Sequence, residues 1–368
     1  MNFLIVTEPD DIHAIYVTIV LESLNHHVIN LFSADFPSKQ KNSVFIDSQA
    51  YHCRTEDDLQ IMQHLGYDVV WWRRPRKPYV LVKEILTVDL KFHQRENEVF
   101  HDNFTQQLAP GAWWINRKEA AIRANYKLLQ LKIAGDVGLT IPTTLCSNHP
   151  QEIKDFFLRH QQKGVIYKPL SYQAWQEHDG LKICYTAKID NLSILEQTNL
   201  SQIPGIFQEQ IPKQLELRIT CFGDYIVAAK IDALDSPEGR IDWRSIHGQA
   251  LNIEPFNLPE TLKHKIRFFM RELGIAFGCI DMILTPAGEY VFLEVNEQGQ
   301  FLFLEQLCPD IPMLDMFIQF LTQQSLNFYW VKPKKLWRME DIQSGIEARY
   351  RYNLAHHLSP RQLDSMHR

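Results

Sequence analysis

The sequence lacks the features that mark secreted, membrane-spanning and nucleic-acid-binding proteins. No apolar run reaches the roughly 18 residues that a membrane helix needs. Basic residues number 38 against 44 acidic ones, and the net charge of −6 provides no general basic surface for a nucleic acid. The opening MNFLIV has no basic lead-in and runs into TEPDD, so we expect a first strand there and not a signal peptide. We therefore expect a cytoplasmic chain without a membrane or nucleic-acid partner.

Cysteine and glycine are scarce, and neither falls into a site motif. The six cysteines are scattered without a C-x-x-C pair, which argues against zinc and fits buried thiols in a reducing compartment. The β-α-β pattern near the start lacks G-x-G-x-x-G, so no dinucleotide site is predicted there. The chain is long and apolar enough to fold: its 368 residues, 45% of them hydrophobic, can form one to three domains with hydrophobic cores.

The first part of the chain predicts an α/β domain over residues 1–116. Buried strands alternate with a helix of amphipathic spacing, which indicates a parallel sheet with a right-handed crossover. A short hairpin is expected over 44–46 and 51–53. The other expected elements are strands at 3–6, 28–32, 67–72 and 113–116 and helices at 12–24 and 81–108.

The remainder predicts further mixed structure and a distinct tail. Residues 171–180 are expected to be a polar loop. From residue 325 the composition shifts to Arg, Lys, His, Tyr and Gln, and we expect a partly helical appendage with a disordered end. The expected helices lie at 117–140, 151–161, 259–273 and 311–324, and the expected strands at 141–143, 164–169, 182–188, 205–209, 208–220, 225–231, 280–284 and 290–295.

The most informative stretch runs from residue 274 to 305. Two apolar runs, joined by a Pro- and Gly-containing turn, each contain one acid, Asp281 or Glu294. Because strand side chains alternate, Glu294 and Asn296 share a face, and antiparallel pairing would bring Asp281 beside them. A salt-bridged acid or a turn asparagine explains any one of these residues. The three together inside apolar strands favour Mg²⁺, which binds hard oxygen ligands and phosphates.

Two basic residues in other predicted strands, Lys168 and Arg218, suggest anion binding. Lys168 stands alone among apolar neighbours and needs an anion, either a phosphate or a structural carboxylate. Glu216 and Arg218 lie on one face of their strand. Arg suits bidentate phosphate binding, although an exposed strand with a weak salt bridge has the same pattern.

The cluster WWRRPRKP follows a predicted strand, at the kind of strand exit where α/β proteins bind ligands. Arg76 and Lys77 are expected to be solvated. For Arg73 and Arg74, which adjoin Trp72 and Pro75, binding of an anionic group and a solvated loop remain equal alternatives.

The order of these parts resembles that of the ATP-grasp ligases. More specifically, it is similar to the ligases that macrocyclise ribosomally made peptides, the microviridin-type or graspetide ligases. A helix lysine, a strand lysine, FQEQIPKQLELRIT, IDWR and GCIDMILTPAGEYVFLEVNEQGQFLFLE carry the general resemblance. The subgroup is indicated by WWRRP, EPDDIHAIYV and SADFPS. The resemblance covers about residues 1–324, and the metal segment is its most specific part for the superfamily.

The resemblance implies an α/β (α+β) ATP-grasp fold with four parts. An N-terminal parallel-sheet domain would span 1–116 and an appendage 325–368. A central lobe over 117–206 and a C-terminal lobe over 207–324, both with antiparallel sheets, would clamp ATP. The loop between the strand lysine and Tyr185 has a single glycine, whereas many relatives close a glycine-rich flap over the phosphates.

The resemblance also implies contacts to ATP. Lys127 and Lys168 would hold the phosphates and the purine edge. Glu209 and the backbone of Ile211 would contact adenine, and Glu216 would bind the ribose hydroxyls.

Further roles concern the metal and the substrate. Asp281, Glu294 and Asn296 would hold Mg²⁺, as two ions, or Mn²⁺ in its place. The hairpin after Phe222 would help to bind a leader peptide. Four cations would face the γ-phosphate, the substrate carboxylate or the acyl phosphate: Arg74, Arg218, Lys230 and Arg244.

The implied activity is an ATP-dependent ligation. The enzyme would phosphorylate Asp or Glu side chains of a precursor peptide that has a leader and an acidic core, and would close ester or amide rings. A homodimer is implied as well. A ligase that joins a small amine or amino acid to a carboxylate, and a nucleotide-binding protein without catalysis, are the alternative hypotheses.

Overall fold

The computed structural model describes most of the chain, and within 174–177 and 180–183 it describes the backbone only. Residues 233–250, which include Arg244, lie outside the described residues. The described residues are 1–64, 66–80, 85–171, 174–177, 180–183, 186–191, 200–232 and 251–359.

The N-terminal part forms a parallel sheet, as the sequence predicts. Its strands run in the order β2-β1-β6-β7, and each neighbouring pair is parallel. A small antiparallel sheet, β3-β4-β5, includes the expected hairpin. The elements are β1 (Asn2–Thr7), α1 (Ile12–Ser23), β2 (His27–Phe32), β3 (Lys41–Ile46), β4 (Tyr51–Glu56), β5 (Ile61–Gln63), β6 (Val69–Trp72), α2 (Leu90–Gln106) and β7 (Trp113–Ile115).

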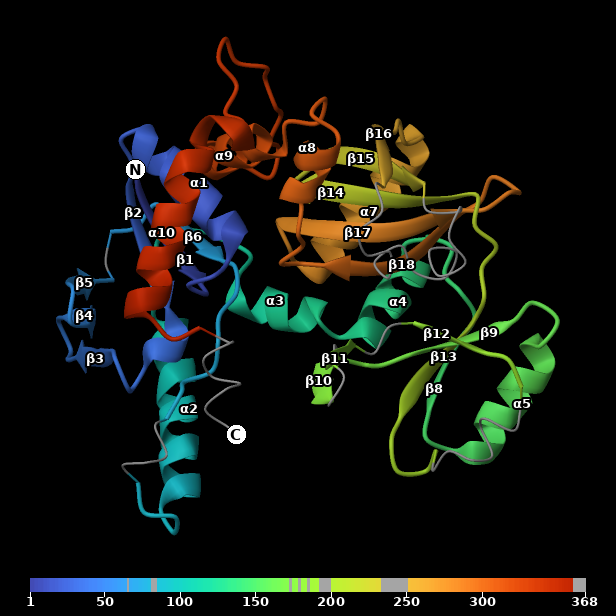
Figure 1. Cartoon of the computed structure of the whole chain (residues 1–368), viewed down its shortest axis with the longest axis horizontal. Coiled ribbons are helices and arrows are strands. Elements are labelled where there is room, and N and C mark those ends of the chain that lie inside the picture. Colours follow the sequence, from blue (N-terminus) through green and yellow to red (C-terminus); the bar gives the residue numbers. More distant parts are fainter. Residues whose placement is uncertain are drawn as a thin grey trace.

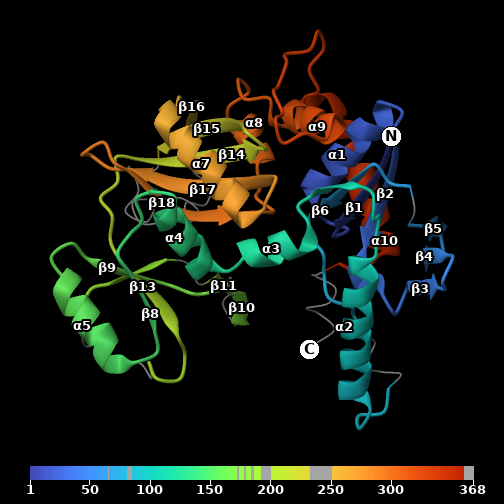
Figure 2. The same ribbon diagram turned by 180° about the vertical axis from the view of Figure 1, so that it is seen from behind.

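The central part is an antiparallel sheet, β12-β9-β13-β8, with α5 packed on one face. Figure 1 shows this sheet below the C-terminal sheet, and Figure 2 shows the same arrangement from behind. Helices α3 and α4 lead into it, and β10 and β11 form a separate hairpin. The elements are α3 (Lys118–Ala124), α4 (Lys127–Asp136), β8 (Thr144–Ser147), α5 (Pro150–His160), β9 (Val165–Lys168), β10 (Ala174–Glu177), β11 (Gly180–Ile183), β12 (Ala187–Ile189) and β13 (Gly205–Glu209).

The C-terminal part is built on a five-stranded sheet in the order β16-β15-β14-β17-β18. Helices α4 and α7 cover one face, and α8 and α9 cover part of the other. The elements are β14 (Leu215–Phe222), β15 (Tyr225–Asp232), β16 (Asn252–Pro255), α7 (Glu260–Leu273), β17 (Phe277–Leu284), β18 (Tyr290–Asn296), α8 (Leu302–Leu307) and α9 (Met313–Gln323).

The tail after residue 324 folds back over the molecule. Its helix α10 (Gln343–His356) lies along α1, and the buried Nδ1 of His357 lies 2.6 Å from the Asp35 carboxylate. Nearer its start, the tail covers the β14–β15 turn, where the Leu326 carbonyl accepts a hydrogen bond from the Asp224 amide at 2.7 Å. The expected helical appendage is therefore present up to residue 359, and residues 360–368 lie outside the described residues.

Several expected elements differ from the structure. The strand expected at 141–143 lies later in the sequence, as β8 at Thr144–Ser147. The helix expected over 117–140 breaks at Asn125 and Tyr126, because Tyr126 adopts an extended conformation and starts a new helix. Within the described part of the helix expected over 81–108, helix α2 begins at Leu90, and residues 81–84 lie outside the described residues. The β-branched residues Thr87 and Val88 just before it disfavour helix. Part of the expected 171–180 loop is strand β10, which pairs with β11.

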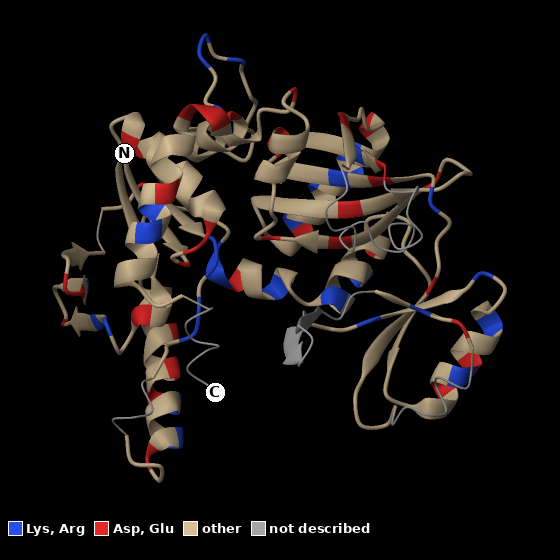
Figure 3. Cartoon of the chain, in the orientation of Figure 1, with Lys and Arg blue, Asp and Glu red and all other residues tan. Residues whose placement is uncertain are grey.

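Figure 3 shows acidic and basic residues interspersed along helices α2, α5 and α10. Within the described part of the chain, none of the helices combines the length and the apolar character that a bilayer crossing requires.

One hydrophobic core joins the N-terminal sheet to the C-terminal lobe and the tail. Phe317 of α9 lies at its centre, fully buried. Its ring centroid lies 4.7 Å from that of Trp71, 5.1 Å from that of Phe277 and 4.9 Å from that of Phe301. The central lobe has a separate small core around α5. The N-terminal and C-terminal parts therefore form one packed unit.

Replacement of Phe317 by Ala should lower the free energy of unfolding by about 3–5 kcal/mol, because it opens a cavity in this shared core. Denaturant unfolding of the variant measures the loss. Phe268→Ala is the control, since that side chain is 49% exposed on α7 and its loss should cost about 0.5 kcal/mol or less. Equal effects of the two substitutions would contradict the shared core.

Candidate active site

An arginine and two acids form a row across three neighbouring strands. Arg218 of β14 pairs in register with Asp281 of β17, which pairs with Glu294 of β18. The Arg218 Nη1 donates to Asp281 Oδ1 at 2.8 Å, and both side chains are buried. The alternation of the sequence thus brings Asp281 and Glu294 side by side, as expected.

Lys127 and Asn296 complete this cluster. The helix break at Tyr126 makes Lys127 the first residue of α4, and its Nζ donates to Glu294 Oε2 at 3.1 Å. Asn296 lies two residues beyond Glu294 on the same face and is exposed. Two carboxylates and an amide oxygen on adjacent rigid strands are a donor set that suits Mg²⁺. The assignment of these residues to a metal stays a prediction.

A cavity of about 650 Å³ adjoins the row. Arg74 of the N-terminal domain and Arg218 and Asn296 of the C-terminal lobe line it, together with the segment that follows β18. The Arg218 guanidinium also lies over the Phe303 ring, 6.0 Å from its centroid. The structure therefore brings together three of the predicted site residues from two distant parts of the sequence.

Glu216, the expected ribose ligand, forms a buried ion pair that the sequence analysis missed. Lys213 Nζ lies 2.5 Å from Glu216 Oε1, and the two side chains are 7% and 9% exposed. Lys213 is the lysine of the I-P-K segment, and its spacing of three residues from an acid was the available signal. The pair holds the Glu216 carboxylate at the start of β14.

Glu297, which directly follows the predicted metal ligands, was also missed. Its buried carboxylate accepts a hydrogen bond from Asn125 at 2.8 Å, and burial raises its pKa. An acid inside LEVNEQG gave little reason to single it out. Its contact with Asn125 ties the end of α3 to the cavity.

Lys168 and Glu209 lie on opposite faces of the central sheet. Lys168 pairs with Ile206, whereas Glu209 pairs with Val165, which belongs to the core under α5. In Figure 1, α5 lies on the side of this sheet away from the five-stranded sheet, so the face with Lys168 is turned toward that sheet.

The Glu209 carboxylate is held by groups of its own lobe. Lys163 Nζ donates to it at 2.9 Å and the Thr143 amide at 3.3 Å. Burial acts to raise the pKa of Glu209, but these hydrogen bonds outweigh burial and lower it. Glu209 and Ile211 line a cavity of about 440 Å³ at the junction of the lobes. The adenine contact of these two residues stays a prediction.

Of the expected substrate cations, Lys230 is not joined to the row. Lys230 pairs in register with Leu217, so it lies on the face opposite to Arg218, and its Nζ lies 2.9 Å from Glu254. Arg244 lies outside the described residues. Of the WWRRP motif, Arg74 lines the cavity, whereas Arg73 is fully buried against Asp11.

Comparison with solved structures shows which proteins the chain is similar to. No protein-family model and no curated protein sequence matches the chain. A RiPP-associated ATP-grasp ligase of Chryseobacterium gregarium, solved with ADP and a leader and core peptide, is 26% identical. Its TM-score is 0.79, over 88% of this chain and 97% of that one.

Two macrocyclases of Microcystis aeruginosa MRC are similar as well. MdnC, bound with precursor peptide MdnA, is 29% identical with a TM-score of 0.76, over 88% of this chain and 100% of its own. MdnB is 26% identical with a TM-score of 0.72, over 87% of this chain and 98% of its own. This chain is an ATP-grasp ligase, and over nearly its whole length it is similar to ligases of the peptide-macrocyclase group. The resemblance noted in the sequence is thereby confirmed, and so is the ATP-grasp fold.

For this ligase, Lys168→Met should weaken ADP binding about tenfold or more, because the strand lysine on the face turned toward the five-stranded sheet loses its charge. Isothermal titration calorimetry with ADP measures the change. Lys132→Met is the control, since Lys132 is exposed on α4 and pairs with Asp136. An unaltered ADP affinity of the Lys168 variant would remove this residue from the nucleotide site.

Proposed function

We propose that this ligase uses ATP to activate Asp or Glu side chains of a ribosomal precursor peptide and closes ester or amide rings between side chains. The observation that carries the proposal is the cavity shared by Arg74, Arg218 and Asn296, beside the row of Asp281, Glu294 and Lys127. It combines cations for an activated carboxylate with ligands for a divalent ion. The similar structures from Chryseobacterium gregarium and Microcystis aeruginosa, solved with leader, core or precursor peptides, support a peptide as the substrate.

The first step is phosphoryl transfer from ATP to the substrate carboxylate. A carboxylate is a poor electrophile, and an oxygen of it attacks the γ-phosphorus to give an acyl phosphate and ADP. The charge of this step spreads over phosphate oxygens, so catalysis consists mainly of positioning and charge neutralisation. Arg218, already oriented by Asp281, faces the cavity and would contact the transferred phosphoryl group. Bound Mg²⁺ would supply further charge neutralisation at the phosphates.

The second step forms the ring. A hydroxyl or amine of another side chain attacks the carbonyl carbon of the acyl phosphate, and phosphate leaves with the bonding electron pair. The nucleophile loses one proton, so each ring removes the elements of one water and converts one ATP to ADP and phosphate. Arg74, on the N-terminal side of the cavity, would hold the substrate carboxylate for both steps.

Other features follow from the resemblance. We propose that Asp281, Glu294 and Asn296 bind two Mg²⁺ ions, and that Mn²⁺ can replace Mg²⁺ in this site. A homodimer and a cytoplasmic location also stay predictions.

Replacement of Glu294 by Ala should reduce peptide-dependent ADP release by roughly 100-fold or more, because the row loses a metal ligand and the partner of Lys127. A coupled ADP assay measures turnover, and circular dichroism checks that the variant is folded. The control is Glu272→Ala, an exposed acid on α7. Unchanged ADP release by the Glu294 variant would refute the metal role.

Intact mass spectrometry tests the reaction itself. A short acidic precursor peptide encoded beside the gene for this ligase, incubated with the enzyme, ATP and Mg²⁺, should lose the mass of one water for each ring. The reaction without ATP is the control. ADP formation with free amino acids, together with an unmodified peptide, would favour the small-molecule ligase instead.

A further inference from the structure

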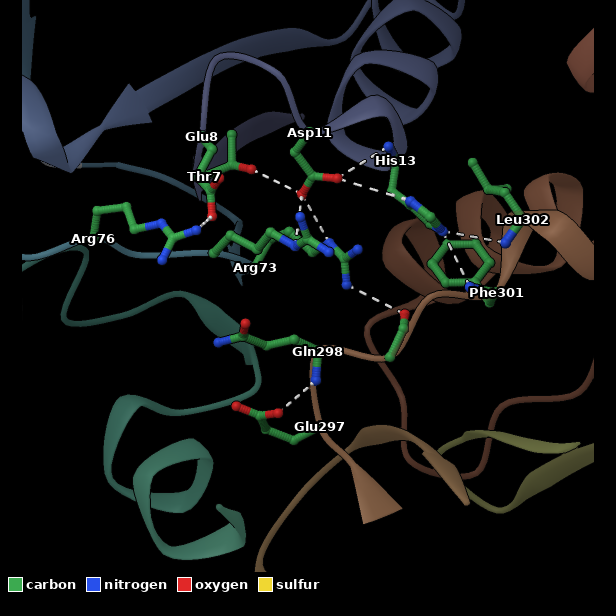
Figure 4. A network of polar contacts seen from close by, with 12 residues as sticks. Thr7, Glu8, Asp11, His13, Arg73, Arg76, Glu297, Gln298, Phe301 and Leu302 are labelled. Atoms are coloured by element: carbon green, nitrogen blue, oxygen red, sulfur yellow. Dashed lines mark hydrogen bonds and ion pairs between the residues drawn. The ribbon is translucent and has the colours of Figure 1, made fainter. Parts of the chain in front are cut away.

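The segment directly after β18, residues 297–301, is held from the N-terminal domain. We call it the post-β18 loop. Arg73 Nη1 donates to the Gly299 carbonyl at 3.2 Å, and His13 Nε2 accepts the Phe301 amide hydrogen at 3.1 Å (Figure 4). Both anchors come from the carboxyl edge of the N-terminal parallel sheet, where β1 and β6 end.

The same loop is held on its other side by the active-site row. Arg218 Nη2 donates to the Gln300 carbonyl at 2.8 Å, while its Nη1 binds Asp281. Gln300 lies between the residues that Arg73 and His13 hold. The Arg218 guanidinium is therefore oriented by one carboxylate and by one carbonyl whose position depends on the N-terminal domain.

Asp11 organises the N-terminal side of this contact. Its carboxylate caps α1, accepts from Thr7 Oγ1 at 3.0 Å and accepts from Arg73 Nε at 2.9 Å. Arg74 Nε lies 3.9 Å from the same carboxylate. Burial acts to raise the pKa of Asp11. The neighbouring positive charges, chiefly Arg73, outweigh burial and lower the pKa to about 2, so Asp11 stays ionised. One buried carboxylate thus holds both the loop anchor Arg73 and the cavity residue Arg74.

His13 must be unprotonated at Nε2, because this atom accepts hydrogen bonds from the Phe301 amide and, at 3.3 Å, from the Leu302 amide. Burial and the neighbouring Arg73 lower its pKa to about 3, which keeps the ring neutral. Its ring also lies edge-on to that of Phe301, with centroids 5.0 Å apart. The side chain is built as an acceptor for two backbone donors at the start of α8.

We propose that Asp11, Arg73 and His13 are positioning residues that fix the post-β18 loop and, through it, the Arg218 guanidinium and the adjoining Asn296. The inference rests on the proposed function, because it assigns these three residues to the phosphate and metal site of that reaction. A displacement of about 1 Å at reacting groups can cost on the order of a hundredfold in rate. The N-terminal domain therefore sets the geometry of a site whose ligands lie on the C-terminal lobe.

The first test replaces Arg73 by Lys, which keeps the charge but cannot bridge Asp11 and Gly299 with a planar fork. Arg76→Lys is the control from the same motif, since Arg76 is 48% exposed and pairs with Glu8. Affinities for ADP and for the ATP analogue AMPPNP are measured by calorimetry with Mg²⁺. Because Arg218 is assigned to the γ-phosphate, AMPPNP affinity should fall roughly tenfold and ADP affinity by less than about threefold. Equal changes for the two nucleotides, or none, would overturn the proposal.

The second test uses His13 and stays informative even if Arg73→Lys does not fold. His13→Gln retains a side-chain acceptor, whereas His13→Leu has a similar size without one. The Leu variant should bind AMPPNP more weakly relative to ADP than the unmodified enzyme does. Its kcat should fall about tenfold or more, with little change in the KM of the peptide. The Gln variant should recover most of the AMPPNP affinity and most of the kcat. Equal behaviour of the two variants, with thermal stability matched, would contradict positioning through this acceptor.

These readouts separate the inference from the function on which it rests. If the unmodified enzyme distinguishes AMPPNP from ADP but modifies no peptide, the macrocyclase function fails and the positioning role is still tested by binding. If the enzyme modifies peptide and the Arg73 and His13→Leu variants keep both kcat and AMPPNP preference, the positioning role alone fails.

Discussion

The buried ion pair between Arg218 and Asp281 is the interaction on which the site depends. Its atoms lie 2.8 Å apart on neighbouring strands, and the side chains are 6% and 10% exposed. Removal of two charges from water costs several kcal/mol per ion, and apolar residues of similar volume often stabilise a sheet as well. Stability alone therefore does not account for the pair. Its neighbours Glu294 and Lys127 extend it into a row in which two carboxylates lie between two cations, an arrangement that suits an anionic, metal-bound substrate.

The shared core determines which parts of the enzyme can move. Residues of the N-terminal sheet, the C-terminal lobe and the tail pack in one cluster around Phe317, so Arg74 and Arg218 keep their relative positions. The central lobe packs its own core under α5. Any closure over a nucleotide would therefore move the central lobe with Lys168 against a rigid pair of domains. The post-β18 loop lies within that rigid pair, which suits a role in positioning.

Local patterns predicted the row of Asp281 and Glu294, whereas long-range contacts determine the surroundings of other site residues. Strand alternation and one turn were enough to place Asp281 beside Glu294, because both facts are local. Lys230 was assigned to the substrate, but a two-residue turn after Phe222 pairs Lys230 with Leu217. Paired residues lie on the same face of a sheet, so the sequence already indicated that Lys230 lies on the face opposite to Arg218. Arg73 was different: its partner Asp11 lies 62 residues away, and no spacing in the sequence connects them.

The tail would limit how the proposed leader peptide could use the β14–β15 hairpin. The turn of this hairpin is covered, because the Leu326 carbonyl binds the Asp224 amide and the Phe328 ring packs against Phe222 and Tyr225. A Cβ on Gly223 would lie 2.2 Å from the Leu326 carbonyl oxygen, so the tail approaches the turn closely. A leader at this end of the hairpin must therefore either contact the tail as part of its site or displace it. Since Phe328 belongs to the shared core, displacement would expose apolar surface, and contact with the tail in place is the less costly arrangement.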